Sequence, residues 1–177
     1  MAEWSDEGEL QVSGRGNQLT KQVGEFLVAA ELARRGWLAA VLSGNTPDFD
    51  LVATDVKGRS VLVQVKAIRK GTWQFDAARY VDIKFVGKKQ VPGRLQRLSV
   101  NPVCVLVVVG DVGEVDAYFV LPMRTLQRLL VKHHQAYLAK HGGVRPKNPK
   151  STHTALSVEQ VERYRDNWAE IDRAVRR

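Results

Sequence analysis

Hydrophobic residues recur along this chain with helical spacing in three segments. The spacing predicts helices over residues 20–35, 122–142 and 157–175. Most of the wheel of the first helix is apolar, so we expect this helix to be largely buried and to end at Gly36. The last helix should begin with a capping box, because Ser157 is followed three residues later by Gln160.

Strand-like patterns fill the part of the chain between the first two helices. Residues 37–42, 50–54 and 60–68 have the pattern of strands, with a turn at Lys57 and Gly58 before the third. Residues 72–86 should be extended. The continuously apolar segment 103–109 predicts a strand covered on both faces of a sheet, with residues 117–121 paired near it. This order of elements predicts a mixed α/β fold, with a central mixed β-sheet flanked by helices and a C-terminal helical part over residues 122–177.

Length and composition are those of one folded domain. The chain has 177 residues, 44% of them hydrophobic, so we expect a single domain over residues 20–177 after a flexible acidic tail over residues 1–19. The longest apolar run is too short to span a membrane, and the acidic N-terminus differs from a secretory signal, so we expect a cytoplasmic protein that does not associate with membranes. The single cysteine, Cys104, excludes an internal disulfide and should be buried.

Positive charge is concentrated in two segments that contain no Asp or Glu. The chain has 27 Lys+Arg against 19 Asp+Glu, a formal net charge of +8, and the acid-free segments span residues 84–109 and 117–158. Lysine and arginine contacts to phosphates release counterions, so we expect these segments to bind DNA, although the same residues could serve only solubility. The residues expected at DNA phosphates are Lys84, Lys88, Lys89, Arg94, Arg97, Arg145, Lys147 and Lys150.

Two other groups of side chains are weaker candidates for metal or DNA binding. Adjacent residues on a helix point about 100° apart, so His133 and His134 cannot chelate one metal, and we expect them on the helix surface or at phosphates. Trp73, Phe75 and Tyr80 could stack on bases, although the core or rim of the sheet is the commoner place for such residues.

Polar side chains also stand where the pattern calls for apolar ones. Glu25 lies on the apolar side of the first predicted helix, where a carboxylate needs a partner unless it reaches solvent near the helix start. Gln64 and Lys66 share one face of the strand over residues 60–68, which is either an exposed edge or a polar site. Asp50 opens the preceding strand, and Asp48 shares its face. A carboxylate, an amide and an ammonium group can therefore converge across two paired strands.

An oxygen-rich pocket of this kind suits a hard cation such as Mg²⁺ or Mn²⁺. Its ligands would be Asp50, the side-chain oxygen of Gln64, a backbone carbonyl, taken here as that of Val65, and waters. The metal would polarise a phosphodiester and lower the pKa of a bound water, while Lys66 could orient that nucleophile or neutralise the developing charge. This chemistry points to a charged phosphate substrate.

Three segments, in this order, resemble the PD-(D/E)XK nuclease superfamily: GEFLVAAELARRGW, PDFDLVA and VLVQVKA. The likeness is nearest to small Holliday-junction-resolvase-like and Mrr-like members, covers about residues 20–70 and implies a restriction-endonuclease-like fold. It implies that Glu25 is a helix-borne carboxylate that joins the metal site and that Asp50 is the metal-binding aspartate. It likewise implies that Gln64 is the second residue near the metal and that Lys66 is the catalytic lysine.

Two features leave alternatives open. Asp48 directly follows Pro47 and is the rival of Asp50, which we prefer because it opens the strand. Gln64 stands where most of the superfamily has Asp or Glu, and the lost charge should weaken metal binding, although a Q-x-K form is similar to that of active Mrr-like members. The sequence therefore predicts a Mg²⁺-dependent DNA endonuclease or, alternatively, a catalytically inactive nuclease-fold module that binds DNA or assembles a complex. A toxin or other partner-binding protein is a third reading, and a homodimer would suit a small nuclease that cuts two strands.

Overall fold

The computed structural model describes residues 14–42 and 48–176. Along the chain its elements are α1 (Gly14–Arg34), β1 (Leu38–Val41), β2 (Leu51–Thr54), β3 (Ser60–Ile68), β4 (Trp73–Asp76), the 3-10 helix η1 (Ala77–Arg79), β5 (Val81–Val86), β6 (Lys89–Leu95), β7 (Val103–Val108), β8 (Ala117–Pro122), α2 (Met123–Lys140), β9 (His153–Leu156), α3 (Val158–Val161), the 3-10 helix η2 (Glu162–Tyr164) and α4 (Ala169–Ala174). Residues 1–13 of the predicted acidic tail lie outside the described residues. Because α1 begins at Gly14, the rest of that predicted tail is helical.

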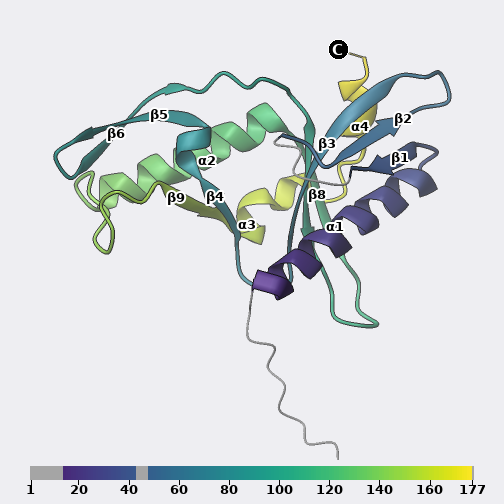
Figure 1. The fold of residues 1–177 in the computed structure, drawn as a ribbon, viewed down its shortest axis with the longest axis horizontal. Helices are drawn as coiled ribbons and strands as arrows, with labels where there is room; N and C mark the ends of the chain where they lie inside the picture. The colour runs from purple at the N-terminus through teal and green to yellow at the C-terminus, as the bar shows by residue number, and fades with distance from the viewer. Residues whose placement is uncertain (1–13, 43–47, 177) are drawn as a thin grey trace, which may run out of the picture.

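Five strands form the central sheet in the order β1-β2-β3-β7-β8. Strands β1, β2 and β3 are antiparallel, β3 pairs parallel with β7, and β7 pairs antiparallel with β8. The predicted mixed α/β fold, with a central mixed sheet flanked by helices, is therefore confirmed (Figure 1). Strand β7 is buried along almost its whole length, as its continuous apolar sequence predicts.

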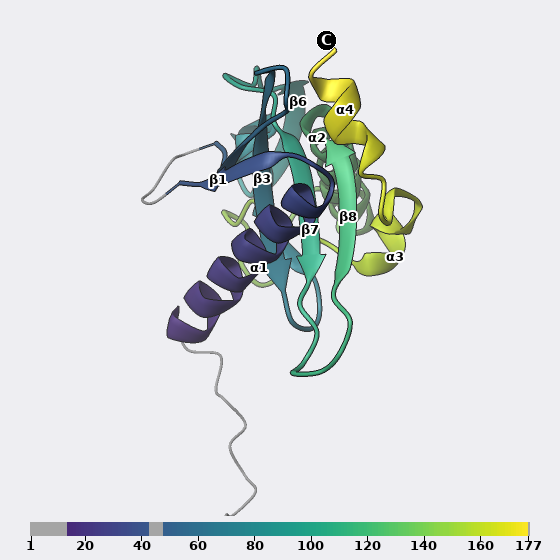
Figure 2. The same cartoon turned by 90° about the vertical axis from the view of Figure 1, so that its right-hand side faces the viewer.

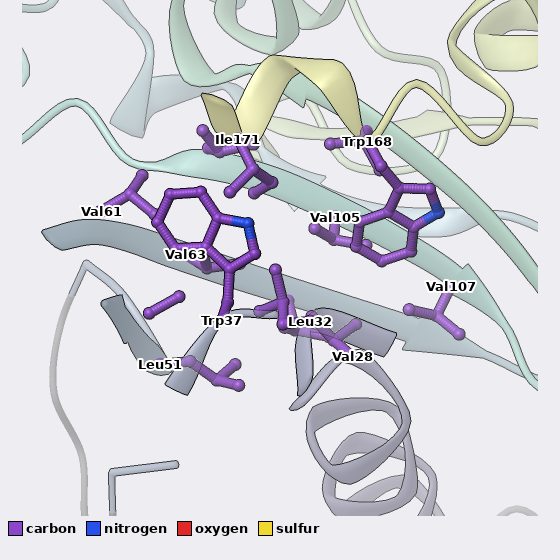
Figure 3. Close-up of a cluster of buried hydrophobic side chains, with 14 of the residues drawn as sticks. Val28, Leu32, Trp37, Leu51, Val61, Val63, Val105, Val107, Trp168 and Ile171 are labelled. Atoms are coloured by element: carbon purple, nitrogen blue, oxygen red, sulfur yellow. The ribbon is translucent and has the colours of Figure 1, made fainter. Parts of the chain in front are cut away.

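Helices cover both faces of this sheet, and each face has its own core. Figure 2 shows α1 crossing one face while α2 lies behind the sheet on the other. On the α1 face, α1 and the C-terminal segment with α4 pack on alternate residues of β3 and β7 (Figure 3); this core includes Val28, Leu32, Trp37, Val63, Val105, Trp168 and Ile171. The core on the α2 face includes Trp73, Phe75, Tyr80, Cys104, Leu106, Phe119, Leu126 and Leu130. The aromatic residues that could have stacked on bases therefore belong to this second core.

Helix α1 packs closely against β3 at Gly24. A Cβ atom added there would lie 2.4 Å from the Cβ atom of Ala67, which is nearer than packed carbon atoms come. The absence of a side chain at this position lets the helix rest directly on the strand. This contact also places the next residue, Glu25, over the sheet near the start of β2.

The first helix is less buried than its sequence predicts. One stripe of α1, formed by Gly24, Val28 and Leu32, is fully buried, whereas Leu19 and Phe26 are more than half exposed. The expectation of a largely buried helix is therefore wrong. A helix lying on a sheet buries only the stripe that faces the strands, and nothing in the described part of the chain covers its outer side.

The C-terminal part departs from a purely helical extension. Strand β9 pairs antiparallel with β4, and the helix predicted over residues 157–175 is divided into α3, η2 and α4. The predicted capping box is present, with the Ser157 N–H donating to Gln160 Oε1 at 2.9 Å. Val161 packs in the α2-face core and Ile171 in the α1-face core, so the segment has to pass the sheet edge at β8. It turns there at Asp166, whose φ is +49°.

Two histidines and the cysteine lie in contrasting places on the α2 face. His134 is fully buried, with its Nε2 3.0 Å from Gln90 Oε1, so the expectation of a surface position is wrong for this residue. It is buried because α2 packs against the β5–β6 hairpin on that side. His133 is half-buried and its Nδ1 lies 3.0 Å from Gln160 Nε2. Cys104 is buried, as predicted. Within the described residues, no helix combines the length and the apolar character needed to cross a bilayer.

Candidate functional site

The backbone hydrogen bonding between β2 and β3 ends just before β2, at Asp50 and Val65. We call this position the notch. The last backbone hydrogen bond of this pair runs from Asp50 N to the Val63 carbonyl at 2.8 Å. The next N–H on that side of β3, that of Val65, donates instead to Asp50 Oδ2, also at 2.8 Å. Because the N–H and C=O of one residue in a strand point to the same side, the Val65 carbonyl faces the same notch. Asp50 therefore lies where the pairing of β2 with β3 ends, with one carboxylate oxygen fixed by the backbone of β3.

Lys21, a residue that the sequence analysis did not single out, joins the two predicted carboxylates. Its Nζ lies 3.4 Å from Glu25 Oε1 and 3.6 Å from Asp50 Oδ1. The side chains of Glu25 and Asp50 are only 12% and 15% exposed, whereas that of Lys21 is 55% exposed. Lys21 and Glu25 are four residues apart on one helix, a signal that the sequence contains, but its contact with Asp50 depends on how α1 lies on the sheet. We call Glu25 and Asp50 the carboxylate pair.

The surroundings of Glu25 shift its ionisation. Burial raises the pKa of Glu25 above its ordinary value of 4.5; the Lys21 ammonium lowers it in part, and the nearby Asp50 carboxylate raises it further. A largely buried carboxylate with a second carboxylate nearby forms a place where a cation is stabilising.

Gln64 and Lys66 lie on the face of β3 opposite α1, and the strand alternation that the sequence predicted holds. Gln64 is opposite Cys104 in the β3–β7 register, and Lys66 is opposite Leu106. Burial raises the pKa of the Cys104 thiol to about 12, while Lys66 lowers it and Asp50 raises it, so both charged groups lie near this thiol. No hydrogen bond or ion pair within residues 14–42 and 48–176 joins Gln64 or Lys66 to Asp50. The polar groups therefore share one region without direct contact.

A cavity of about 110 Å³ adjoins Gln64 on this face. Gln64 is 8% exposed, and its Oε1 is buried without a hydrogen-bond donor among the described residues. Asp48 also lines the cavity, where it accepts a hydrogen bond from Ser99 Oγ at 2.9 Å and lies 3.8 Å from the Arg79 guanidinium. The two aspartates that the sequence placed on one face thus have different partners, with Asp50 in the notch and Asp48 in the cavity.

The atoms near the notch that could serve as metal ligands are all oxygen atoms. Among the described residues, no cluster of three or more His, Cys, Asp or Glu side chains is arranged to hold a metal. A divalent ion here would depend on the carboxylate pair, the Val65 carbonyl, Gln64 Oε1 and water. Oxygen donors suit Mg²⁺, and two observations fit a cation: the carboxylates already surround an ammonium group, and the buried Gln64 oxygen lacks a donor. These residues fit a hard cation held by few charges.

Two segments lie at one end of the molecule and carry most of the residues predicted at DNA phosphates: the β5–β6 hairpin and the loop before β9 (Figure 1). Gln90 of β6 donates its backbone N–H to the Gly143 carbonyl at 2.8 Å, and its side-chain amide donates to the carbonyls of Pro149 and Ser151 at 2.8 and 2.9 Å. These bonds bring the two acid-free segments together although they are far apart in sequence. We call the exposed residues there the basic surface: Lys84, Lys88, Lys89, Arg94, Lys147 and Lys150.

Two of the predicted arginines lie apart from the basic surface. Arg145 is half-buried, with its guanidinium 4.6 Å from the centre of the Tyr137 ring. Arg97 is exposed and lines the cavity beside Gln64. Arg97 is thus the predicted DNA-binding residue nearest to the candidate site.

Comparison with known proteins gives distant structural likeness and no sequence match. No protein-family model matches the chain, and no curated protein matches it. A solved structure of a bacterial homing endonuclease, I-Ssp6803I, is similar to this chain, with 16% sequence identity, 87% of this chain and 91% of that chain covered, and a TM-score of 0.45. Any statement about the chemistry of this chain therefore depends on its own side chains.

Proposed function

We propose that this protein is a metal-dependent DNA endonuclease of the restriction-endonuclease-like, PD-(D/E)XK type, which hydrolyses phosphodiester bonds with Mg²⁺ or Mn²⁺. The observation that supports the proposal most strongly is the carboxylate pair, held at the notch beside the strand that carries Gln64 and Lys66. Two largely buried carboxylates around one ammonium group, and a buried amide oxygen without a donor on the neighbouring strand β3, serve no evident purpose in the core. In a site that binds a cation and a phosphate, these groups have a clear purpose.

Each residue has a distinct role in this proposal. Glu25, Asp50, Gln64 and the Val65 carbonyl would hold the metal, and a bound metal would polarise the phosphodiester and supply a water of lowered pKa. The Val65 N–H holds Asp50 in a fixed orientation before substrate arrives. Lys66 donates hydrogen bonds to a phosphate oxygen and stabilises the negative charge that develops there.

DNA is the proposed substrate because of where the positive charge lies. The basic surface carries six exposed Lys and Arg side chains, and Arg97 stands at the cavity next to Gln64. A duplex lying from the basic surface toward the notch would place successive phosphates along these groups. Contacts of this kind give affinity without base specificity.

One observation favours the second candidate function, a DNA-binding module without catalysis. Lys21 already offsets one of the two negative charges of the carboxylate pair, and Gln64 adds no charge to help a metal compete. A protein whose carboxylates are permanently paired with lysine would need no metal. It would still bind DNA through the basic surface.

A cleavage assay decides between the two functions. Purified protein is incubated with Mg²⁺ or Mn²⁺ on linear, supercoiled, single-stranded and branched DNA, beside Asp50→Asn and a matched control, Asp111→Asn, in the loop between β7 and β8. We expect the protein and the control to cut at least one substrate and Asp50→Asn to lose at least about 100-fold in rate. Salt-dependent binding without any cleavage would support the binding module. Cleavage by Asp50→Asn at the normal rate would exclude the notch as the catalytic site.

The DNA surface has a separate test that does not require catalysis. Replacing Lys147 and Lys150 with Gln should weaken binding about equally for all sequences and reduce the slope of log K against log salt by roughly 1 to 2 units. The control replaces Lys57 and Lys70, which lie in the turns before and after β3, and should leave the slope unchanged. If the slope of log K against log salt is the same for both double variants, DNA does not bind at Lys147 and Lys150.

A further inference from the structure

We infer that Lys21 is a built-in counter-ion of the carboxylate pair. Its ammonium group holds Glu25 and Asp50 together while no metal is bound, and a divalent metal displaces it. This inference rests on the proposed metal-dependent nuclease function. It adds a positioning residue on α1 that sets how readily the site accepts its metal.

The geometry makes the ammonium group and a metal mutually exclusive. Lys21 Nζ contacts Glu25 Oε1 and Asp50 Oδ1 at 3.4 and 3.6 Å, so it stands between the two carboxylates. The other oxygen of Asp50, Oδ2, already accepts the Val65 N–H. A metal held by the carboxylate pair would therefore compete with the ammonium group for the Asp50 carboxylate. Mg²⁺ requires its oxygen ligands at about 2.0–2.1 Å, which leaves no room for an ammonium group between them.

Lys21 is also the member of the trio that can move. Its side chain is 55% exposed, whereas those of Glu25 and Asp50 are 12% and 15% exposed. A lysine stem on the outer part of a helix can turn into solvent without disturbing the core. The carboxylates, one fixed by Val65 N–H and the other carried by a helix packed on β3 at Gly24, stay in place.

The charges explain why a counter-ion is useful here. With both carboxylates ionised, Lys21 and Lys66 bring the site to a formal charge of zero, and Gln64 adds none. Without Lys21, the metal-free protein would carry two nearby, largely buried carboxylates with little to offset their repulsion. When Lys21 turns away, the formal charge of the site becomes −1, which attracts an incoming metal.

Calorimetric titration with Mn²⁺ tests the displacement. The forms compared are the unmodified protein, Lys21→Met, Lys21→Arg and a matched control, Lys132→Met, which removes an exposed lysine from α2. Lys21→Met should bind Mn²⁺ about 3- to 30-fold more tightly, as expected when a partly exposed cation no longer competes. Lys132→Met should match the unmodified protein. Lys21→Arg, which keeps the charge, should not show the gain.

Thermal unfolding without metal tests the counter-ion role independently. Lys21→Met should lower Tm in the presence of a chelator, and adding Glu25→Gln should restore part of the loss because one of the repelling charges is gone. Equal Mn²⁺ affinity in the unmodified protein and Lys21→Met would overturn the displacement and leave the proposed function intact. Absence of Mn²⁺ binding in every form would overturn the proposed function together with the displacement. An unchanged Tm in Lys21→Met would overturn the counter-ion role.

Discussion

Strand β3 presents an apolar face to α1 and a polar face to the cavity on the side of α2. On the α1 face, Val61, Val63 and Val65 are buried beneath a helix that touches the strand at Gly24. On the other face, Gln64 lines a cavity of about 110 Å³, and Lys66 follows two residues later on the same side of the strand. The comparison shows that the two faces of one strand have different roles. The closely packed face fixes where the helix lies, and the open face leaves room for polar side chains and a ligand.

The largest expected effect separates the two faces directly. Lys66→Ala should reduce cleavage by at least about 100-fold and change the free energy of unfolding by less than about 1 kcal/mol, because a half-buried lysine contributes little to the core. Val63→Ala should cost about 1–3 kcal/mol of stability through the cavity it leaves, with cleavage retained while the protein is folded. Cleavage rates and urea unfolding of both variants provide the check. Failure of Lys66→Ala to fold would assign Lys66 to the structure instead.

The next effect concerns the closely packed face. Alanine favours helices over glycine by about 1 kcal/mol, yet Gly24→Ala should destabilise the protein by a net of about 1–2 kcal/mol because its Cβ would meet that of Ala67 at 2.4 Å. Gly16→Ala is the matched control on the same helix, since no atom lies within 4 Å of its added Cβ. It should be neutral or slightly stabilising. If both variants gain stability in urea unfolding, α1 does not rest on β3 in this way.

A smaller effect is expected from adding charge on the open face. Gln64→Glu keeps the shape of the side chain and adds the carboxylate that the site lacks, so it should tighten Mn²⁺ binding by on the order of tenfold. Without metal, the same variant should have a lower Tm, because the new carboxylate is buried. Calorimetry and thermal unfolding measure the two effects. If the new carboxylate pairs with Lys66 and Mn²⁺ still does not bind, the binding-module function is favoured.

The smallest effect is a pH dependence at the notch between the faces. Glu25 has a pKa above 4.5 in the folded chain, chiefly because it is buried, so between 4.5 and that raised value the folded state binds more protons than the unfolded state. The contribution of Glu25 to the free energy of unfolding therefore falls as pH rises through this window. Glu25→Gln removes the group, so its stability should decline less over the same window. Urea unfolding in chelator at a series of pH values is the measurement, and parallel curves for the two proteins would contradict it.

Local features of this protein could be predicted from neighbouring residues alone. The bounds of β3, the shared face of Gln64 and Lys66, the burial of β7 and the capping box at Ser157 all follow from alternation or from spacings of a few residues. So does the mixed α/β fold, because three strands follow the first helix and a fully apolar strand comes later in the chain. These features depend on backbone geometry within one or two elements, which the sequence states directly.

Other features depended on which elements meet in space. The sequence could show that Lys21 and Glu25 are four residues apart, but only the packing of α1 on β3 at Gly24 brings Lys21 to Asp50. His134 looked like a surface residue because nothing in its helix indicates that β6 covers it. The residues of the β5–β6 hairpin and the segment over residues 142–152 likewise become one basic surface only through the hydrogen bonds of Gln90. Contacts between distant segments are decided by complementary shape and burial across the whole chain, and no short stretch of sequence contains that information.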